Sequence, residues 1–265
     1  MPRLVIFLDI DDTILQTAPK CPPGEPVEPA AFNRAGEVLS FMTRAQRRLL
    51  EFWLAQGTVI PVTGRTDAAL DRVAIAFSSW RITHHGAVVR QPDGVLPTAW
   101  RESIQPALVA AAPALRELFA QLNDGAAAGG YRVHLHEIEG VPSYISAKAD
   151  DGDATHEATM AGLRIRLENM GLPATLALHC NGNNLAVMVK GAQKLDAVRL
   201  VIAELERDGP LVTIGAGDSL TDLPFMRLCD FALTPRESQI QHETWEGHQG
   251  DWSHRLDHER RGAGF

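Results

Sequence analysis

The chain has 265 residues, 45% of them hydrophobic and 22% charged, a composition typical of a globular protein long enough to bury a sizeable core. Its formal net charge of −8 disfavours nucleic acid and anionic membranes as partners, because both attract clustered lysine and arginine. The three cysteines lack the spacing of metal ligands, and no apolar run has the length of a bilayer span or a signal peptide. We therefore expect a cytoplasmic protein with reduced thiols, no membrane partner and no evident protein partner.

The first predicted strand is the apolar run Leu4–Leu8, whose composition is typical of a central parallel strand buried on both faces. Three carboxylates, Asp9, Asp11 and Asp12, follow it directly. An extended backbone would place Asp9 and Asp11 on the same side. Paired carboxylates repel each other, so a fold keeps them where a cation or a proton transfer uses them. For this motif alone, a strand followed by an acidic turn remains an equal alternative.

The next elements favour a parallel sheet. The proline-rich residues 17–40 predict a surface loop, which could serve as a lid or an interface. A capping box at Thr43 predicts a helix that ends at Gly57. A second buried strand is expected over residues 58–65, with a bulge or an unpaired position at Pro61.

A helix over residues 68–77 and a short strand near Ile82 complete a βαβα pattern, which predicts a doubly wound, Rossmann-like parallel sheet. The middle of the chain has a different pattern, helix, strand, strand, repeated twice, which predicts an α+β (αββαββ) unit inserted into the α/β one. The predicted elements of that unit are a helix at 106–122, strands at 131–138 and 141–147, a helix at 155–170, and strands at 175–180 and 184–189.

The parallel pattern resumes with a predicted helix over residues 194–207 and an apolar strand over 211–214. Beyond Gln241 the chain is polar, and we expect a mobile tail in which the histidines are solvated. The predicted division is an α/β core formed by residues 1–86 and 190–240, an inserted domain at 87–189, and a tail at 241–265.

A second acidic pair, Asp218 and Asp222, follows the strand at 211–214. Their spacing of four predicts that both lie on one face at the start of a helix, where the helix dipole favours negative charge. A capped helix with an acidic first turn is the alternative for this pair alone. Together with Asp9 and Asp11, the pair would supply oxygen ligands suited to Mg²⁺.

Two further segments contribute groups that bind phosphate. Thr63 offers a hydroxyl, and Gly64 offers a turn in which the backbone can approach a ligand. Lys194 offers an ammonium group just before the last core helix. Taken singly, Thr63 is typical of a helix cap and Lys194 of a solvated lysine. Together with a metal ion, the two groups are suited to binding a phosphoryl group.

Four short motifs, in this order, carry a resemblance to a known family: Asp9-Ile10-Asp11-Asp12-Thr13, Val62-Thr63-Gly64-Arg65, Lys190-Gly191-Ala192-Gln193-Lys194, and Gly217-Asp218 through Asp222. They resemble the motifs of the haloacid dehalogenase superfamily, over residues 4–233. The insertion between the second and third motifs resembles a C2-type cap domain, similar to the Cof-like and sucrose- or trehalose-phosphate phosphatase branch. The sequence departs from the family pattern at Asp12, where many relatives carry glycine, and at Leu195.

The resemblance implies a role for each motif residue. Asp9 would be the nucleophile that forms an aspartyl-phosphate, and Asp11 would act as general acid and then general base. Thr63, with Gly64, and Lys194 would hold the transferring phosphoryl group. The implied Mg²⁺ ligands are Asp9, the backbone carbonyl of Asp11 and Asp218. Asp222 would bind the ion through a water molecule or would orient the other ligands.

The expected function is that of a Mg²⁺-dependent phosphomonoesterase acting through an aspartyl-phosphate on a small phosphorylated metabolite, with sugar phosphates as the leading candidate substrates. A phosphomutase and a phosphometabolite-binding regulatory protein with an idle site are the alternatives.

Because the core recognises only phosphate, the cap should select the substrate. The candidate specificity residues are His84, His85, His136, Glu137, Tyr144, Lys148, His179 and Asn183. For each of them alone, a solvated strand face is the simpler interpretation, and His134 with His136 lacks a third ligand for zinc.

Overall fold

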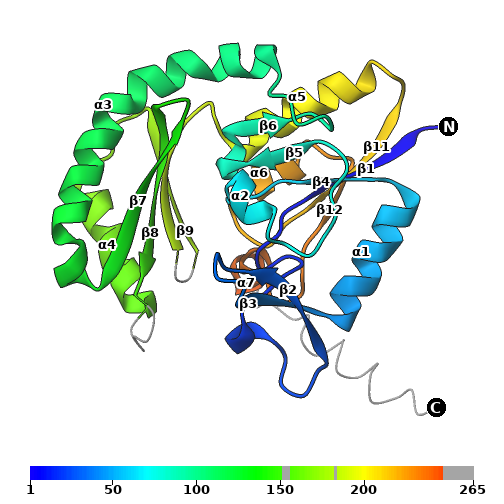
Figure 1. The fold of residues 1–265 in the computed structure, drawn as a ribbon, viewed down its shortest axis with the longest axis horizontal. Helices are drawn as coiled ribbons and strands as arrows, with labels where there is room; N and C mark the ends of the chain where they lie inside the picture. The colour runs from blue at the N-terminus through cyan, green and yellow to red at the C-terminus, as the bar shows by residue number, and fades with distance from the viewer. Residues whose placement is uncertain (151–155, 182–183, 247–265) are drawn as a thin grey trace.

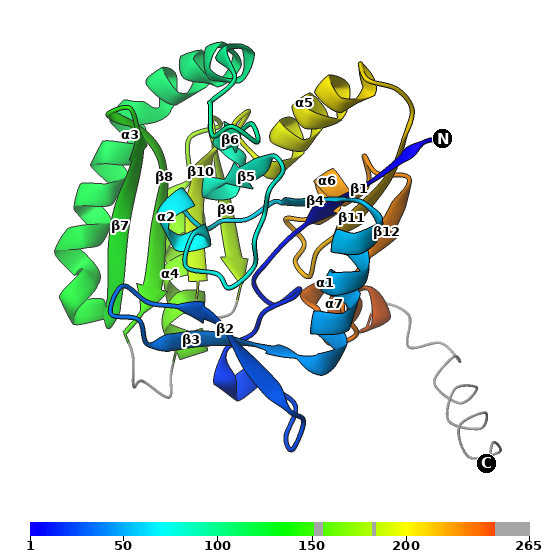
Figure 2. The ribbon, with the colours of Figure 1, turned by 45° about the vertical axis from the view of Figure 1, so that its right-hand side comes forward.

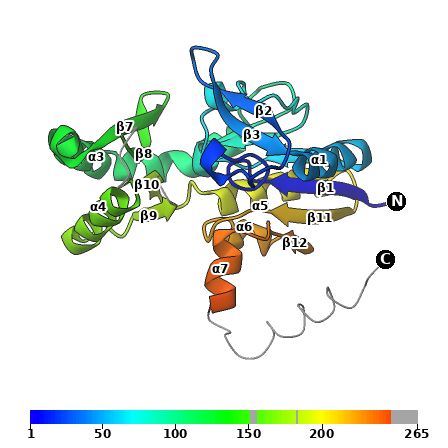
Figure 3. The same cartoon turned by 90° about the horizontal axis from the view of Figure 1, so that it is seen from below.

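The two largest sheets of the molecule each have four strands, one sheet being parallel and the other antiparallel (Figure 1). The structure is a computed structural model that describes residues 1–150, 156–181 and 184–246. The view from below in Figure 3 separates the two parts, with the antiparallel sheet and its helices on one side and the parallel sheet on the other. The fold is therefore the predicted α/β core with an inserted α+β unit.

The parallel sheet has the strand order β12-β11-β1-β4, and every pair in it is parallel. β1 lies between β11 and β4, and the side chains from Ile6 to Leu8 are fully buried, as its apolar sequence predicts. Because the strands are parallel, the segments that follow β1, β4 and β11 meet at one edge. The bounds are β1 Arg3–Leu8, β4 Thr58–Pro61, β11 Leu211–Ala216 and β12 Phe231–Leu233.

Helices and short turns surround this sheet. The predicted capping box is present: Thr43 and Gln46 exchange hydrogen bonds at the start of α1. Pro61 ends β4, so the ladder does not need the donor that proline lacks, and the chain continues through a single bridge between Val62 and Ile82. The helices are α1 Arg44–Gln56, α2 Asp67–Leu70, α5 Lys194–Glu206, α6 Leu223–Met226 and α7 Gln239–Glu246, with the 3-10 turns η1 Ala18–Lys20 and η2 His84–Gly86.

Two predictions for the amino-terminal half were wrong. The proline-rich segment contains a hairpin, β2 Val27–Phe32 with β3 Val38–Thr43, and tolerates Pro29 because this two-stranded sheet consists of edges and is irregular there. The helix expected over residues 68–77 stops after α2. The following backbone instead hydrogen-bonds to β2, with the Ala74 amide donating to the Ala30 carbonyl at 2.8 Å.

Two predictions for the carboxyl-terminal half also need correction. The tail does not begin at residue 241, because α7 extends to Glu246 and buries Ile240. Residues 247–265 lie outside the described part of the chain. Asp218 and Asp222 do not share a helix face: Asp222 is the N-cap of the short helix α6, and Asp218 lies in the preceding turn.

The inserted unit has the predicted αββαββ order, and its antiparallel sheet has the strand order β7-β8-β10-β9. Figures 1 and 2 show α3 and α4 on the outer face of this sheet, with the other face turned toward the parallel sheet. The bounds are α3 Thr98–Gly129, β7 Tyr131–Ile138, β8 Val141–Ala149, α4 His156–Met170, β9 Leu176–Asn181 and β10 Asn184–Val189. None of the described helices is both long and apolar enough to cross a membrane.

A small hairpin leads from the core into the insertion. β5 Arg81–Thr83 pairs with β6 Val88–Arg90, and η2 forms the turn between them. One cluster of buried side chains runs from Phe7 in the core to Val133 in the insertion, so the two parts share apolar packing. The limits of the core and cap at residues 86, 87, 189 and 190 stay predictions.

Candidate active site

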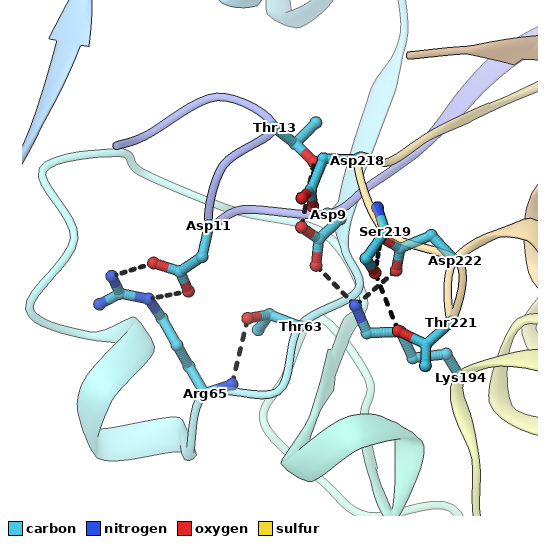
Figure 4. Close-up of polar contacts among 10 residues, drawn as sticks. All are labelled: Asp9, Asp11, Thr13, Thr63, Arg65, Lys194, Asp218, Ser219, Thr221 and Asp222. Atoms are coloured by element: carbon cyan, nitrogen blue, oxygen red, sulfur yellow. Dashed lines mark hydrogen bonds and ion pairs between the residues drawn. The ribbon is translucent and has the colours of Figure 1, made fainter. Parts of the chain in front are cut away.

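Three buried carboxylates meet at the carboxyl ends of β1 and β11 (Figure 4). Asp9 follows β1, Asp218 follows β11, and Asp222 occupies the N-cap position of α6. One oxygen from each lies within 4.8 Å of the others, and the three residues are 5%, 4% and 0% exposed. The parallel sheet thus brings together the acidic residues of the first and last motifs.

Lys194, the first residue of α5, inserts its ammonium group into this cluster. Its Nζ donates to Asp9 Oδ1 at 2.6 Å and to Asp222 Oδ1 at 2.7 Å. The η2 turn packs closely against the start of this helix, since a Cβ on Gly86 would lie 2.3 Å from the backbone nitrogen of Lys194. The predicted phosphate-binding lysine therefore lies beside the predicted nucleophile.

The cluster carries more negative than positive charge when all four side chains are ionised. Burial raises the pKa of Asp9 well above its usual value, although Lys194 opposes this shift. Burial, followed by repulsion from Asp222, raises the pKa of Asp218 to about 7. One ammonium group does not neutralise three buried carboxylates, so the site favours an additional cation.

Two hydroxyl groups that the sequence interpretation did not assign to the site hold these carboxylates. Thr13 Oγ1 lies 3.1 Å from Asp9 Oδ2 and 3.3 Å from Asp218 Oδ1. Ser219 donates to Asp222 Oδ2 through its hydroxyl at 2.7 Å and its amide at 3.0 Å. The signal for both was their position inside the two acidic motifs.

The donor set of the cluster fits Mg²⁺. Carboxylate oxygens are the ligands that this ion prefers, and it neutralises the surplus negative charge. Among the described residues, Asp9, Asp218 and Asp222 form the one group of three side chains placed to hold a metal. His134 and His136 have ring centroids 6.4 Å apart and do not belong to such a group.

Asp11 lies apart from the carboxylate cluster, contrary to the expectation that it would share one side with Asp9. β1 ends at Leu8, so the alternation of an extended strand does not extend to these residues. Arg65 instead binds Asp11 through two hydrogen bonds, Nε to Oδ2 at 2.8 Å and Nη2 to Oδ1 at 2.6 Å. The Asp11 side chain stays 52% exposed, whereas that of Arg65 is 14% exposed. The sequence offered no signal for this pairing beyond the presence of both residues in motifs.

Thr63 and Gly64 form the turn after β4. Thr63 is 1% exposed, and its Oγ1 accepts a hydrogen bond from the Arg65 amide at 3.1 Å. A Cβ on Gly64 would lie 2.4 Å from Cε1 of His85, so only glycine admits the imidazole at this position. The turn therefore links the phosphate-binding motif to the histidines of η2.

The η2 turn has an unusual backbone. His84, His85 and Gly86 have successive φ angles of 54°, 58° and 110°. A left-handed conformation costs a residue other than glycine roughly 1–3 kcal/mol and concentrates at functional sites. The turn is held against the phosphate-binding segment, because the His84 amide donates to the Arg65 carbonyl at 2.8 Å.

The inner face of the cap sheet presents uncharged rings to η2. Tyr144 lies T-shaped to His85, with centroids 5.0 Å apart, and stacks on His136 at 4.1 Å. His179 lies 6.2 Å from His85. Burial lowers the pKa of His136 and of His179 to about 4, so both imidazoles are neutral near pH 7. Five predicted specificity residues, His84, His85, His136, Tyr144 and His179, thus come together.

Three predicted specificity residues do not join this group. Glu137 forms an ion pair with Arg116 of α3 at 3.4 Å. Lys148 is exposed, four residues beyond Tyr144 along β8. Asn183 lies outside the described residues. Glu137 follows His136 along β7, so strand alternation directs it to the opposite face of the sheet, where α3 supplies Arg116.

No protein-family model and no curated protein matches this chain. Solved structures do match: the sucrose-phosphatase from Synechocystis sp. PCC6803 is 16% identical, with a TM-score of 0.55, over 95% of this chain and 90% of that chain. A trehalose-6-phosphate phosphatase related protein is 18% identical, with a TM-score of 0.51, over 87% and 84%. The C-terminal domain of trehalose-6-phosphate phosphatase from C. albicans is 15% identical, with a TM-score of 0.51, over 94% and 77%. At these identities the similarities show a shared fold, and it is the α/β core with an inserted α+β unit that the motifs led us to expect.

Proposed function

We propose that this protein is a phosphomonoesterase that hydrolyses a small phosphorylated metabolite, with sugar phosphates as the first candidates. The observation that carries the proposal is the buried Asp9 carboxylate, held by Lys194 at 2.6 Å beside two further carboxylates. The names of the solved structures with a similar fold, sucrose-phosphatase and trehalose-6-phosphate phosphatase, support the same class of substrate. All three cysteines are unpaired, which agrees with a cytoplasmic location.

In the proposed reaction, a carboxylate oxygen of Asp9 attacks the phosphorus atom and an aspartyl-phosphate forms. The bond between phosphorus and the leaving-group oxygen breaks, and Asp11 donates a proton to that oxygen. Arg65 would orient Asp11 through the two hydrogen bonds at 2.6 and 2.8 Å. Each Asp11 oxygen has a second lone pair outside these two hydrogen bonds, and the exposed side of the carboxylate would face the leaving group.

Thr63, Gly64 and Lys194 would bind the transferring phosphoryl group. The threonine hydroxyl and the turn amides donate hydrogen bonds, and the ammonium group offsets the negative charge that repels the nucleophile. Lys194 contacts the nucleophile and Asp222 directly, so it would hold the phosphoryl group next to the attacking oxygen.

Asp9, Asp218 and Asp222, with the backbone carbonyl of Asp11, would hold Mg²⁺. When bound, this ion supplies positive charge that lets an anionic phosphate approach an anionic nucleophile. The hydroxyl groups of Thr13 and Ser219 would orient the carboxylates of Asp9 and Asp222 through their hydrogen bonds.

In the second half of the reaction, Asp11 accepts a proton from a water molecule that attacks the aspartyl-phosphate. The bond between phosphorus and the Asp9 oxygen then breaks, which releases inorganic phosphate and restores the carboxylate.

The test is phosphate release from a panel of sugar phosphates, nucleotides, phosphorylated amino acids and phosphoglycerates, with Mg²⁺ or EDTA. We expect one class to be hydrolysed much faster than the rest, only with Mg²⁺ and only by a protein that retains Asp9. Folded protein that releases no phosphate from any compound would overturn the proposal and leave phosphoryl transfer to another acceptor, or binding without turnover, as the function to pursue.

A further inference from the structure

A chain of three side chains connects α2 to the η2 turn. Thr83, the last residue of β5, is fully buried, and its Oγ1 donates to Asp67 Oδ1 at 2.7 Å. The same oxygen lies 3.0 Å from Nδ1 of His84. These residues have no part in the proposed phosphoryl chemistry, so their connection needs a separate explanation.

The direction of these hydrogen bonds follows from the charge of Asp67. Its second oxygen accepts from Arg90 Nε at 2.6 Å. Although burial favours the neutral acid, the hydrogen bonds from Thr83 and Arg90 lower the pKa of Asp67, so it is a carboxylate near pH 7. A carboxylate only accepts hydrogen bonds. The single hydroxyl hydrogen of Thr83 therefore points to Asp67.

That direction fixes the tautomer of His84. Because the Thr83 hydrogen is already donated, its oxygen accepts from His84, and Nδ1 carries the proton. Burial lowers the pKa of His84, so the ring holds one proton rather than two near pH 7. Nε2 is then a hydrogen-bond acceptor, and it has no partner among the described residues.

His84 lies between the phosphate-binding turn and the cap. Its amide is bonded to the Arg65 carbonyl, and its ring lies T-shaped to Tyr144, with centroids 6.2 Å apart. Its backbone is held at a φ of 54°, which a residue other than glycine adopts at a cost. Position, strain and a fixed acceptor atom all point to recognition of a ligand.

We propose that His84 is a specificity residue whose Nε2 accepts a hydrogen bond from a hydroxyl group of the leaving group, with Asp67 and Thr83 as its positioning residues. This inference rests on the proposed phosphatase function. The neighbouring rings of His136 and Tyr144 are uncharged and suit an uncharged, hydroxylated leaving group rather than an anionic one.

The tautomer can be measured without any substrate. Two-bond ¹H–¹⁵N correlation spectra distinguish a protonated from an unprotonated imidazole nitrogen, and the signals of His84 are identified by their loss in His84→Asn. We expect protonated Nδ1 in the wild type and in Thr83→Ser, which keeps the hydroxyl group. Thr83→Val should shift the ring toward protonated Nε2. Protonated Nε2 in the wild type, or no response to Thr83→Val, would overturn the assignment.

The role of His84 is tested by comparing two substrates, the sugar phosphate hydrolysed fastest and p-nitrophenyl phosphate, whose leaving group has no hydroxyl beyond the ester. Asparagine tolerates the left-handed backbone but is too short to replace Nε2. His84→Asn should reduce kcat/KM for the sugar phosphate about tenfold more than for p-nitrophenyl phosphate, the value of one hydrogen bond. Thr83→Val should reproduce part of this selective loss, and Thr83→Ser should restore it.

Equal losses on the two substrates would refute the specificity role while leaving the phosphatase proposal in place. Absence of phosphate release from every substrate by the wild type would refute the phosphatase proposal itself, and with it the leaving-group role, whereas the tautomer measurement would still stand on its own.

Discussion

The two sides of the site differ in charge. On the core side, Asp9, Asp218, Asp222 and Lys194 are buried ionisable groups, and the Lys194 ammonium group lies within hydrogen-bond distance of Asp9 and Asp222. On the cap side, the rings around Tyr144 are uncharged near pH 7, because burial lowers the pKa of the imidazoles. Under the proposed function, the core would bind phosphate and metal, and the cap would bind an uncharged leaving group.

This difference separates chemistry from selectivity. Substitutions in the core should reduce turnover of every substrate, because they remove interactions with the reacting phosphoryl group. Substitutions on the cap face should change the ranking of substrates, because they alter contacts with the leaving group alone. The following experiments sharpen that distinction or break it.

The largest expected effect is that of Asp9→Asn, which should lower turnover by about 10³-fold or more, because an amide cannot form the aspartyl-phosphate. Asp12→Asn is a matched control: Asp12 lies three residues away, its half-buried carboxylate pairs with Lys20, and it has a left-handed backbone that asparagine tolerates. Initial rates of phosphate release would measure both. A similar loss in both variants would contradict the assignment of the nucleophile.

Lys194→Met should abolish most activity and lower the stability of the metal-free protein by about 3–5 kcal/mol, since it leaves buried carboxylates without their cation. Lys190→Met, at an exposed position in the same motif, serves as the control. Urea unfolding monitored by circular dichroism measures the free energy of unfolding. If both variants lose the same stability, the ammonium group does not hold the cluster together.

Mg²⁺ should stabilise the folded protein, by about 2.7 kcal/mol when its concentration is one hundred times the dissociation constant. Asp218→Asn should remove most of this gain, because one of the three clustered carboxylates is lost. Thermal melts with Mg²⁺ and then with excess EDTA provide the measurement, and Asp208→Asn, at an exposed ion pair with Arg3, is the control. An unchanged melting temperature in Mg²⁺ would exclude this cluster as a metal site.

A smaller effect is expected for Tyr144→Ala on the cap face. Loss of the ring that stacks on His136 and contacts His85 should raise KM for the preferred substrate by roughly tenfold, with kcat changed less. Tyr144→Phe keeps the ring and should retain most of the affinity. Steady-state kinetics separate the two parameters, and a fall in kcat for every substrate would place Tyr144 in the chemical step instead.

The last prediction concerns pH. His136 and His179 have folded pKa values of about 4, below the unfolded value of about 6.5. Between these values the unfolded chain binds more protons, so the free energy of unfolding should fall as pH decreases from 6.5 to 4. Unfolding curves at several pH values test this. The double variant His136→Asn/His179→Asn should show a weaker fall over that window, and an unaltered slope would mean that these imidazoles are not desolvated.

Much of the fold followed from the sequence because the signals are local. The run from Leu4 to Leu8 gave the central strand, the Thr43 capping box gave the start of α1, and the pattern of the insertion gave its αββαββ order. The helix expected over residues 68–77 ends early, because the backbone after α2 hydrogen-bonds to β2. Local propensity does not encode that pairing.

The sequence by itself determined which residue types reach the site, because parallel strands bring their carboxyl ends to one edge whatever the details of the side chains. Only the tertiary structure decided how those side chains pair. Lys194 meets Asp9 across 185 positions, and Arg65 binds Asp11 across 54. Such partners are selected by packing between distant elements, since no sequence period relates them, and so the clamp on Asp11 and the tautomer of His84 emerged only from the folded chain.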